Sequence, residues 1–225
     1  MTVAEQLAEV RERIATAARA SGRGPDTVTL VVVTKEVDVD AIRAALTAGA
    51  TDLGENRAQE LVPKAEAIAR DDTHAPRWHF IGRLQRNKVR AAAPHVALWQ
   101  SIDRDDVARE VAHRAPGAAM LVQVNVAREP QKGGCEPERV GALVDACRAL
   151  GCRVEGLMTV PPAAGDPRPV FARLRRMTDD LGLPVCSMGM SGDFEDAIAE
   201  GATMVRVGSA VFGPRPGSGG ARRLA

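Results

Sequence analysis

Short apolar runs alternate with amphipathic segments along the whole chain, and this alternation constrains the fold more than any other feature. The first run, TVTLVVVT at residues 27–34, is rich in β-branched residues, as expected for a strand buried on both faces. Seven further runs also read as strands. They are a short one near Asp52, then residues 78–82, 97–102, 118–126, 153–158, 184–188 and 203–208.

Helical segments separate these strands, at residues 40–46, around Glu60 and Ala67, and at 105–113, 137–150 and 169–181. Eight strands, each followed by a helix, predict an α/β fold, a single (β/α)8 TIM barrel. A doubly wound open sheet is the alternative, because periodicity does not reveal whether a sheet closes.

An extra helix precedes the first strand. Thr2 and Glu5 form a capping box, and Gly22 is suited to end the helix in a left-handed conformation. One apolar face is expected from Val3, Leu7, Val10, Ile14 and Ala17. We expect one barrel domain over residues 1–212 and a flexible tail over 213–225, where the sequence is GPRPGSGGARRLA.

The composition excludes several classes of function. A net charge of +1 argues against nucleic acid or an acidic membrane as the main partner. No apolar run approaches the ~20 residues that span a bilayer, and early charged residues such as Glu9 and Arg11 argue against a signal peptide. The four cysteines form no CxxC pair, so we expect reduced thiols, no metal site and a cytoplasmic location.

The residues that follow the strands carry the functional signal, because the sites of such barrels lie at the carboxyl ends of their strands. Lys35 directly follows the first apolar run. Partial burial there favours the neutral amine, which can form a Schiff base with a carbonyl. The alternative is a lysine that extends from the barrel rim into water.

The last two strands lead into Ser191-Gly192 and Gly208-Ser209. Glycines allow backbone N–H groups to approach an anion, and loops after the seventh and eighth strands commonly bind phosphate in this fold. The alternative is that these residues form turns and caps. Asp193 disfavours an anion unless its side chain is turned away.

Arg206 lies between Val205 and Val207 in the last strand. If it points into the barrel it needs a partner, and a cofactor's ring nitrogen is one candidate. Asn56 can donate a hydrogen bond to a phenolate oxygen or cap a helix. His79 reads as a core histidine more readily than as a catalyst, and Met190 as a filler of the core.

Several motifs together resemble the pyridoxal phosphate homeostasis proteins, or proline synthase co-transcribed homologues, which look like the fold type III barrel of alanine racemase standing alone. The matching motifs are VVVTK (31–35), GENRAQE (54–60), WHFIGRLQRNK (78–88), SID (101–103), GLMTVP (156–161), SMGMSGDFEDAI (187–198) and MVRVGSAVFG (204–213).

The resemblance implies that Lys35 holds pyridoxal 5′-phosphate (PLP) as an internal aldimine and that Arg206 faces the pyridine nitrogen. It also implies that Asn56 lies near the ring substituents, and His79 and Met190 near the pocket wall. Four residues would hold the phosphate: Ser191, Gly192, Gly208 and Ser209. Arg83 departs from the family pattern at the pocket mouth, as does the end of the chain after the final FG.

The function implied by the resemblance is PLP homeostasis without strong catalysis, with amino acids or PLP-dependent apoenzymes as partners. A first helix that packs back on the barrel would suit a monomer. An arginine beside the ring nitrogen keeps that nitrogen unprotonated, which weakens the ring as an electron sink.

A PLP-dependent amino-acid racemase is the alternative function. It needs a second base, usually a tyrosine from a second domain, and this chain has no tyrosine, so His79 would have to serve. Two more hypotheses stay open on the sequence. One is a cofactor-free barrel enzyme that uses Lys35 on a sugar phosphate, and the other is a purely structural or interaction protein.

Overall fold

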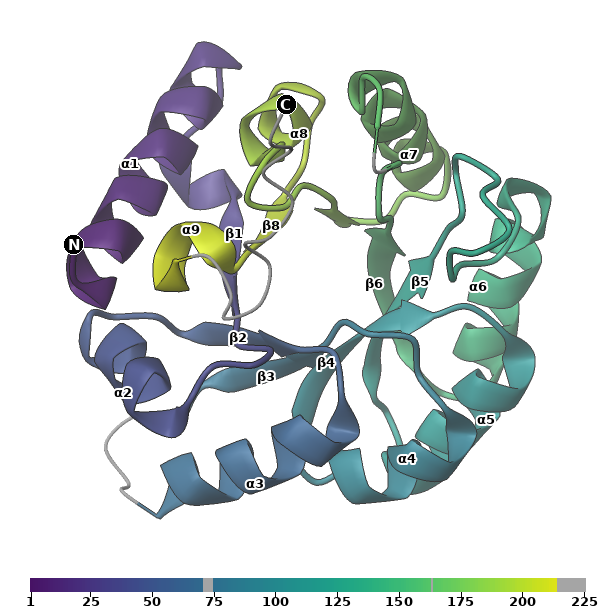
Figure 1. Ribbon diagram of the computed structural model, residues 1–225. Helices are drawn as coiled ribbons and strands as arrows, with labels where there is room; N and C mark the ends of the chain where they lie inside the picture. The colour runs from purple at the N-terminus through teal and green to yellow at the C-terminus, as the bar shows by residue number, and fades with distance from the viewer. Residues whose placement is uncertain (71–74, 163, 214–225) are drawn as a thin grey trace, which may run out of the picture.

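The apolar runs pair in the order in which they occur along the chain and close on themselves (Figure 1). In the computed structural model, which describes residues 1–70, 75–162 and 164–213, every strand is parallel to its neighbours, and β1 pairs with both β2 and β8. The strands are β1 (Thr29–Val33), β2 (Asp52–Glu55), β3 (Arg77–Phe80), β4 (Val96–Ile102), β5 (Ala119–Gln123), β6 (Arg153–Met158), β7 (Val185–Ser187) and β8 (Met204–Val207). The predicted (β/α)8 barrel is confirmed, and the open sheet is wrong.

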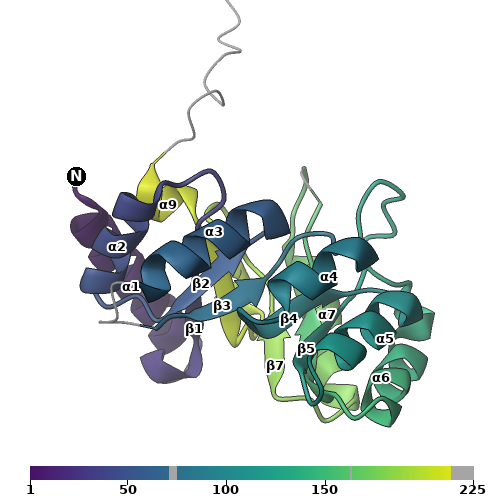
Figure 2. The ribbon, with the colours of Figure 1, turned by 90° about the horizontal axis from the view of Figure 1, so that it is seen from below.

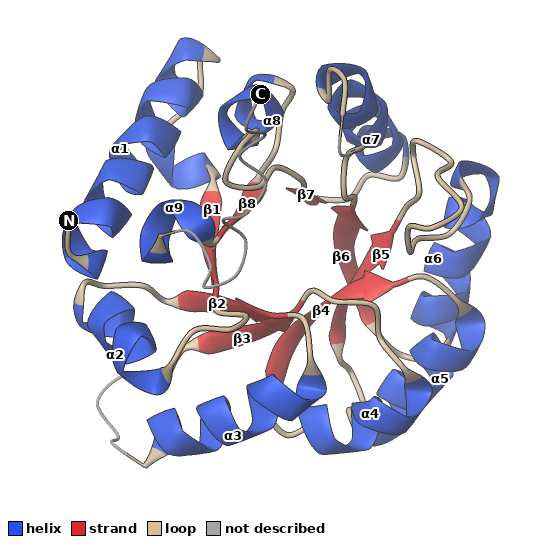
Figure 3. Cartoon of the chain, viewed as in Figure 1, coloured by secondary structure: helices blue, strands red, loops and turns tan. Residues whose placement is uncertain are grey.

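Helices surround the strands (Figure 3). They are α1 (Val3–Ala20), α2 (Val39–Thr47), α3 (Ala58–Ala69), α4 (Arg86–Ala92), α5 (Asp105–Arg114), α6 (Val140–Ala149), α7 (Arg168–Asp180), α8 (Phe194–Ala199) and α9 (Ser209–Phe212). None of the helices in the described ranges is long and apolar enough to cross a membrane. The tail predicted over 213–225 lies outside the described residues from position 214 onward.

Helix α1 completes the ring of helices. It begins with the predicted capping box between Thr2 and Glu5, and Gly22 follows it with a φ of +71°. Its buried stripe is Leu7, Val10, Ile14 and Ala18, so Ala18 lies inward where Ala17 was expected. Because α9 has only four residues, α1 covers this side of the barrel and packs against α8, α9 and α2 (Figure 1).

Several predicted elements are shorter in the structure, and two of them differ most from the prediction. The fifth strand, expected over residues 118–126, ends at Gln123, because the polypeptide turns after this residue. The Asn125 side chain stabilises the turn, since its amide nitrogen donates to the Glu129 carbonyl oxygen and its Oδ1 accepts the Glu129 N–H. The helix expected over 137–150 begins with a 3₁₀ turn, Pro137–Arg139, before α6. Figure 2 shows the loops after β5 and β6 on the same side of the barrel as α9. This side holds the carboxyl ends of the strands.

The interior of the barrel is partly polar. Strand pairing sets Val31 beside Asp52 on one side and Arg206 on the other, so these side chains share the inner face. A small apolar cluster fills part of this space: Val31, Leu98, Ala119, Leu121, Met158 and Met204. The remainder is occupied by buried polar side chains, which lead toward the site described next.

Candidate cofactor site

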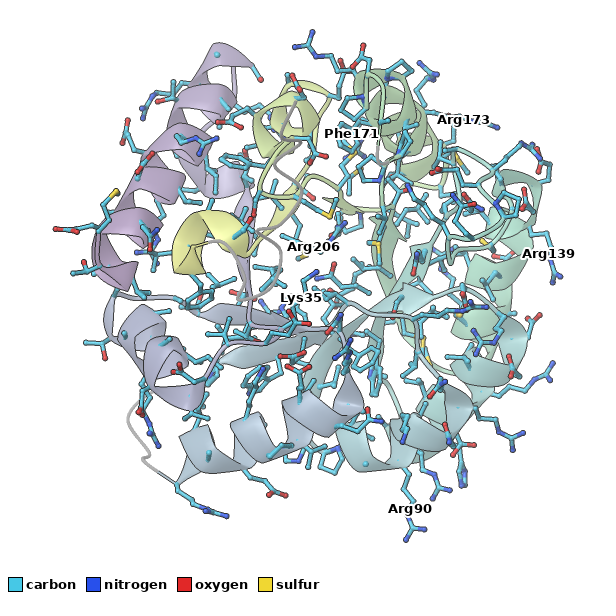
Figure 4. All side chains as sticks on the ribbon, viewed as in Figure 1. Lys35, Arg90, Arg139, Phe171, Arg173 and Arg206 are labelled. Atoms are coloured by element: carbon cyan, nitrogen blue, oxygen red, sulfur yellow. The ribbon has the colours of Figure 1, made fainter. Side chains whose placement is uncertain are left out.

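A cavity of about 410 Å³ opens among the carboxyl ends of β1, β2 and β8 and the loop after β7. The structure brings eight of the nine predicted cofactor residues to its wall: Lys35, Asn56, Met190, Ser191, Gly192, Arg206, Gly208 and Ser209. Figure 4 shows Lys35 and Arg206 near the centre of the barrel. Apolar side chains that the sequence did not single out complete the wall: Val33, Val37, Ile81, Val160 and Phe212.

Lys35 is half-buried two residues beyond β1, and the peptide groups on both sides of it are anchored. The carbonyl oxygen of Thr34 accepts a hydrogen bond from Lys64 Nζ at 2.8 Å. The N–H of Glu36 donates to Glu60 Oε2 at 2.8 Å. Glu36 also has a φ of +61°, a conformation that a non-glycine residue keeps only when its surroundings impose it.

The anchor is a buried ionic cluster centred on Lys64. Its ammonium group lies 2.6 Å from Glu55 Oε1 and 2.9 Å from Glu60 Oε2. Glu55 is fully buried, and it also accepts hydrogen bonds from the Thr34 hydroxyl and the Asn56 N–H. Burial opposes ionisation of Glu60, but the bonds from Glu36 and Lys64 outweigh it and lower its pKa. The cluster therefore fixes the position from which the Lys35 side chain enters the cavity.

The loops after β7 and β8 are joined through Ser191. Its Oγ accepts the backbone N–H of Gly208 at 3.1 Å and that of Ala210 at 3.5 Å. A Cβ on Gly208 would lie 3.1 Å from the carbonyl oxygen of Val33, whereas a Cβ on Gly192 would meet nothing within 4 Å. Gly208 thus lets β8 lie close to β1, and Gly192 leaves open space at the wall.

Asp193 accepts the N–H of Met190 at 2.6 Å through Oδ1, so this oxygen bonds the backbone of its own loop. Burial raises the pKa of Asp193, although the Met190 bond and the charge of Arg206 oppose that change. The bond to the Met190 N–H and the raised pKa of Asp193 both reduce the repulsion that we expected Asp193 to exert on an anion.

Arg206 is the most unusual residue of the site. It is 4% exposed, and its guanidinium donates to Ser187 Oγ and to the carbonyl oxygen of Thr159, each at 2.7 Å. Both partners are neutral, and no carboxylate within the described ranges forms an ion pair with it. Burial lowers the pKa of Arg206 to about 10, which leaves it charged at neutral pH. A buried cation in a cavity wall is suited to bind a hydrogen-bond acceptor of a ligand.

Asn56 contributes a buried polar atom to the same wall. Its Oδ1 has no hydrogen-bond partner among the residues that the structure describes. It does not cap a helix, because Arg57 is the N-cap residue of α3. Gly82 holds its backbone in place, since a Cβ there would lie 2.0 Å from the Asn56 carbonyl oxygen.

His79 does not reach the cavity wall, where the resemblance placed it. It is fully buried inside the barrel, where Nε2 lies 2.9 Å from Asp52 Oδ1 and Nδ1 lies 2.7 Å from Gln100 Nε2. This matches its interpretation as a core histidine. Arg83 also lies outside the cavity and lines a neighbouring depression with Arg57 and Lys88.

Sequence reasoning missed two residues that shape the site. Lys64 lies on the apolar face of α3 with Leu61, Ala65 and Ile68, and a lysine at such a position signals a buried partner. Gln100 stands within the apolar run ALWQSI, where an inward amide needs hydrogen-bond partners.

Comparison with known proteins places this architecture. The family model for the alanine racemase N-terminal domain matches residues 6–216. A pyridoxal phosphate homeostasis protein of Pseudomonas aeruginosa is 42% identical over 224 residues, which cover 95% of this chain and 96% of that protein. One of Aquifex aeolicus is 42% identical over 229 residues, with coverage of 96% and 99%. The chain belongs to the pyridoxal phosphate homeostasis protein family.

Solved structures agree with membership of the pyridoxal phosphate homeostasis protein family. PipY of Synechococcus elongatus, in a structure with PLP bound, has a TM-score of 0.80 at 31% identity, covering 94% of this chain and all of that one. An alanine racemase from Corynebacterium glutamicum, at 18% identity and a TM-score of 0.65, shares the fold. The resemblance inferred from the motifs is confirmed.

Proposed function

We propose that this protein binds pyridoxal 5′-phosphate, bonds it to Lys35 and holds it for release, as its part in intracellular PLP homeostasis. The observation that carries the proposal is Arg206, a buried guanidinium that forms no ion pair with a carboxylate of the described residues, in the wall of the cavity that Lys35 enters. Among common cofactors, PLP combines an aldehyde for the amine with a ring nitrogen that accepts a hydrogen bond from the guanidinium.

The other cavity residues fit the rest of the cofactor. Backbone N–H groups around Gly192 and Gly208 suit the phosphate, with the Ser191 and Ser209 hydroxyls beside them. The side-chain amide nitrogen of Asn56 is a donor that suits the phenolate oxygen of the ring. A volume of about 410 Å³ is within the range of small-molecule sites.

When bound, PLP supplies an aldehyde that condenses with an amine to a Schiff base and a ring that withdraws electrons. The Lys64 cluster sets the starting point of the Lys35 side chain, and the apolar wall excludes water from its amine. Arg206 would donate to the ring nitrogen without giving up a proton, which would keep that nitrogen unprotonated. This arrangement favours storage above strong stabilisation of a carbanion.

A racemase is not favoured by the cavity. Two-base racemisation needs a proton acceptor on each side of the substrate carbon. The ionisable side chains among the described cavity residues are those of Lys35 and Arg206, and a guanidinium is not a base at neutral pH. His79, the substitute base considered from the sequence, is enclosed inside the barrel.

We include in the proposal that the protein acts as a cytoplasmic monomer and passes PLP to apoenzymes or amino acids. Helix α1 packs back on the barrel against α8, α9 and α2, which suits a monomer. The four cysteines are free and buried, as suits a reducing compartment.

The test is a titration of the PLP-free protein with PLP, followed by near-visible absorption. The wild type is expected to gain a Schiff-base band that Lys35→Ala lacks. Loaded protein is then mixed with the apo-form of a PLP-dependent aminotransferase, whose recovered activity reports release. Rapid exchange of D- and L-alanine by the wild type, lost in Lys35→Ala, would contradict the proposal and favour the racemase.

A further inference from the structure

A continuous chain of hydrogen bonds crosses the barrel interior from Arg206 to Asp52. Arg206 Nη1 lies 2.7 Å from Ser187 Oγ, which lies 2.7 Å from Gln100 Oε1. Gln100 Nε2 lies 2.7 Å from His79 Nδ1, and His79 Nε2 lies 2.9 Å from Asp52 Oδ1. Strands β7, β4, β3 and β2 contribute Ser187, Gln100, His79 and Asp52 in turn. The hydrogen bonds therefore join distant parts of the sequence into one polar core.

The hydrogen bonds of this series all run in one direction, with each donor on the Arg206 side and each acceptor on the Asp52 side. A guanidinium only donates, so Ser187 accepts from Arg206 and gives its single proton to Gln100 Oε1. The amide nitrogen of Gln100 then donates to Nδ1 of His79, which must be unprotonated there, and Nε2–H donates to Asp52. The amide nitrogen also lies 3.1 Å from Met204 Sδ, a weak acceptor. The reverse order would need a proton on both ring nitrogens of His79.

The two ends of the chain lie at opposite faces of the barrel. Arg206 lines the cofactor cavity, and Asp52 lines a groove of about 640 Å³ near the starts of β1 and β2. Burial opposes ionisation of Asp52, but the hydrogen bonds from His79 and Thr51 contribute most to outweighing it, so its pKa is lowered. The chain therefore ends on a carboxylate at neutral pH.

The middle of the chain has no access to water. His79, Gln100 and Ser187 are all fully buried, so each depends on its neighbours in the chain for hydrogen bonds. A change in one link is therefore transmitted to the next, because no solvent molecule can replace the lost partner.

We propose that His79, Gln100 and Ser187 are positioning residues for the cofactor, which orient the Arg206 guanidinium toward the ring nitrogen of PLP through this one-directional chain. The inference rests on the proposed function, because it assigns the ring nitrogen to Arg206. It adds a role for His79 that requires no contact with the cofactor. It also requires the Nε2–H tautomer of His79, whether or not PLP is bound.

Nitrogen-15 NMR tests both parts of the inference. In protein with labelled histidine, His79 is expected as the neutral Nε2–H tautomer before PLP is added, and its signals are expected to move on PLP binding. With ¹⁵N-labelled PLP, the ring nitrogen is expected to be unprotonated. Ser187→Ala removes the link to Arg206. It is expected to change both signals and to weaken PLP binding about 2- to 10-fold, the range for one hydrogen bond.

Two further variants separate positioning from general stability. His79→Gln keeps a donor and an acceptor at similar spacing and is expected to retain the ring-nitrogen signal, whereas His79→Leu is expected to lose it. Thr178→Ala removes another buried hydroxyl, bonded to Leu174, and is expected to leave the ring-nitrogen signal unchanged.

The Nδ1–H tautomer of His79, or a ring-nitrogen signal unaffected by both Ser187→Ala and His79→Leu, would overturn the inference. Failure of the wild type to bind PLP would instead overturn the proposed function. The tautomer of His79 and its response to Ser187→Ala remain measurable in that case, so the two failures are distinguishable.

Discussion

Replacing Lys64 with methionine tests whether the buried ionic cluster holds the Lys35 segment. The variant keeps the length and the apolar part of the side chain but removes the ammonium group that lies 2.6 Å from Glu55 Oε1. Glu55 is 0% exposed, so its charge loses its counterion without gaining water. Breaking a buried ion pair in this way costs about 3–5 kcal/mol. The hydrogen bonds that Glu55 keeps from Thr34 and Asn56 favour the lower end of that range.

The free energy of unfolding from urea titrations is the measurement. Arg114→Met is the control, because Arg114 forms an ion pair with Glu110 at the i,i+4 spacing of the Lys64–Glu60 pair but is 38% exposed. Such a pair is worth about 0–1 kcal/mol. The double variant Glu55→Gln/Lys64→Met removes the stranded charge and is expected to recover part of the loss. If Lys64→Met costs no more than Arg114→Met, the cluster does not have the role assigned to it.

Binding of PLP should respond as well. Without Lys64, the carbonyl of Thr34 loses its bond at 2.8 Å, and Glu60 loses the cation that holds it against the N–H of Glu36. The Lys35 side chain then starts from a less defined position. Lys64→Met is expected to bind PLP more weakly under conditions in which it is still folded, as measured by absorption titration. Unchanged affinity would show that the peptide anchors are not needed for binding.

Three further predictions concern the cavity wall and pH. Gly82→Ala places a Cβ 2.0 Å from the Asn56 carbonyl oxygen, so it is expected to destabilise the protein by about 1–3 kcal/mol and to weaken PLP binding. Gly141→Ala is the control, because its Cβ would meet nothing within 4 Å in α6, and it is expected to be harmless. In the folded protein the pKa of Glu60 is lowered, so its ionised carboxylate stabilises the fold fully at pH values above its ordinary pKa of 4.5. This contribution to the free energy of unfolding is lost as the pH falls through the folded pKa. The stability difference between wild type and Glu60→Gln should therefore shrink in urea titrations from pH 7 to pH 3. Ser191→Ala removes the hydroxyl that joins the loops after β7 and β8, which we propose to hold the phosphate. It is expected to weaken the binding of PLP and also the ability of inorganic phosphate to compete with PLP, both measured by absorption.

The alternation of apolar runs was sufficient to predict eight strands alternating with helices, because a strand covered on both faces leaves a continuous apolar signature, whereas the closure of the sheet is seen only in the structure. Residues 153–158 were predicted with the bounds of β6. The fifth strand was predicted too long, because its apolar run continues into a loop that the Asn125 side chain stabilises. Pairwise contacts of this kind lie outside the reach of periodicity.

The predicted residues at the cavity share a simple property: each lies within the first few residues after a strand or, like Arg206, alternates with apolar neighbours within one. His79 also lies within a strand, but its side chain is enclosed in the barrel and does not reach the cavity. Sequence reasoning missed this because a single sequence does not show how far along the barrel axis a side chain lies. Lys64 and Gln100 went unassigned because each has a partner far away in sequence, and the partner of Lys64 at Thr34 lies 30 positions away. Only the closed barrel brings Ser187 to Gln100, 87 positions apart.

The covalent bond to Lys35 is the central claim, and borohydride reduction of PLP-loaded protein followed by peptide mass spectrometry tests it most directly. We predict a reduced pyridoxyl group on Lys35 in the wild type and none in Lys35→Ala, with Lys64, Lys88 and Lys132 unmodified at equimolar PLP. Protein that stays colourless and unmodified at Lys35 after incubation with PLP would contradict the account.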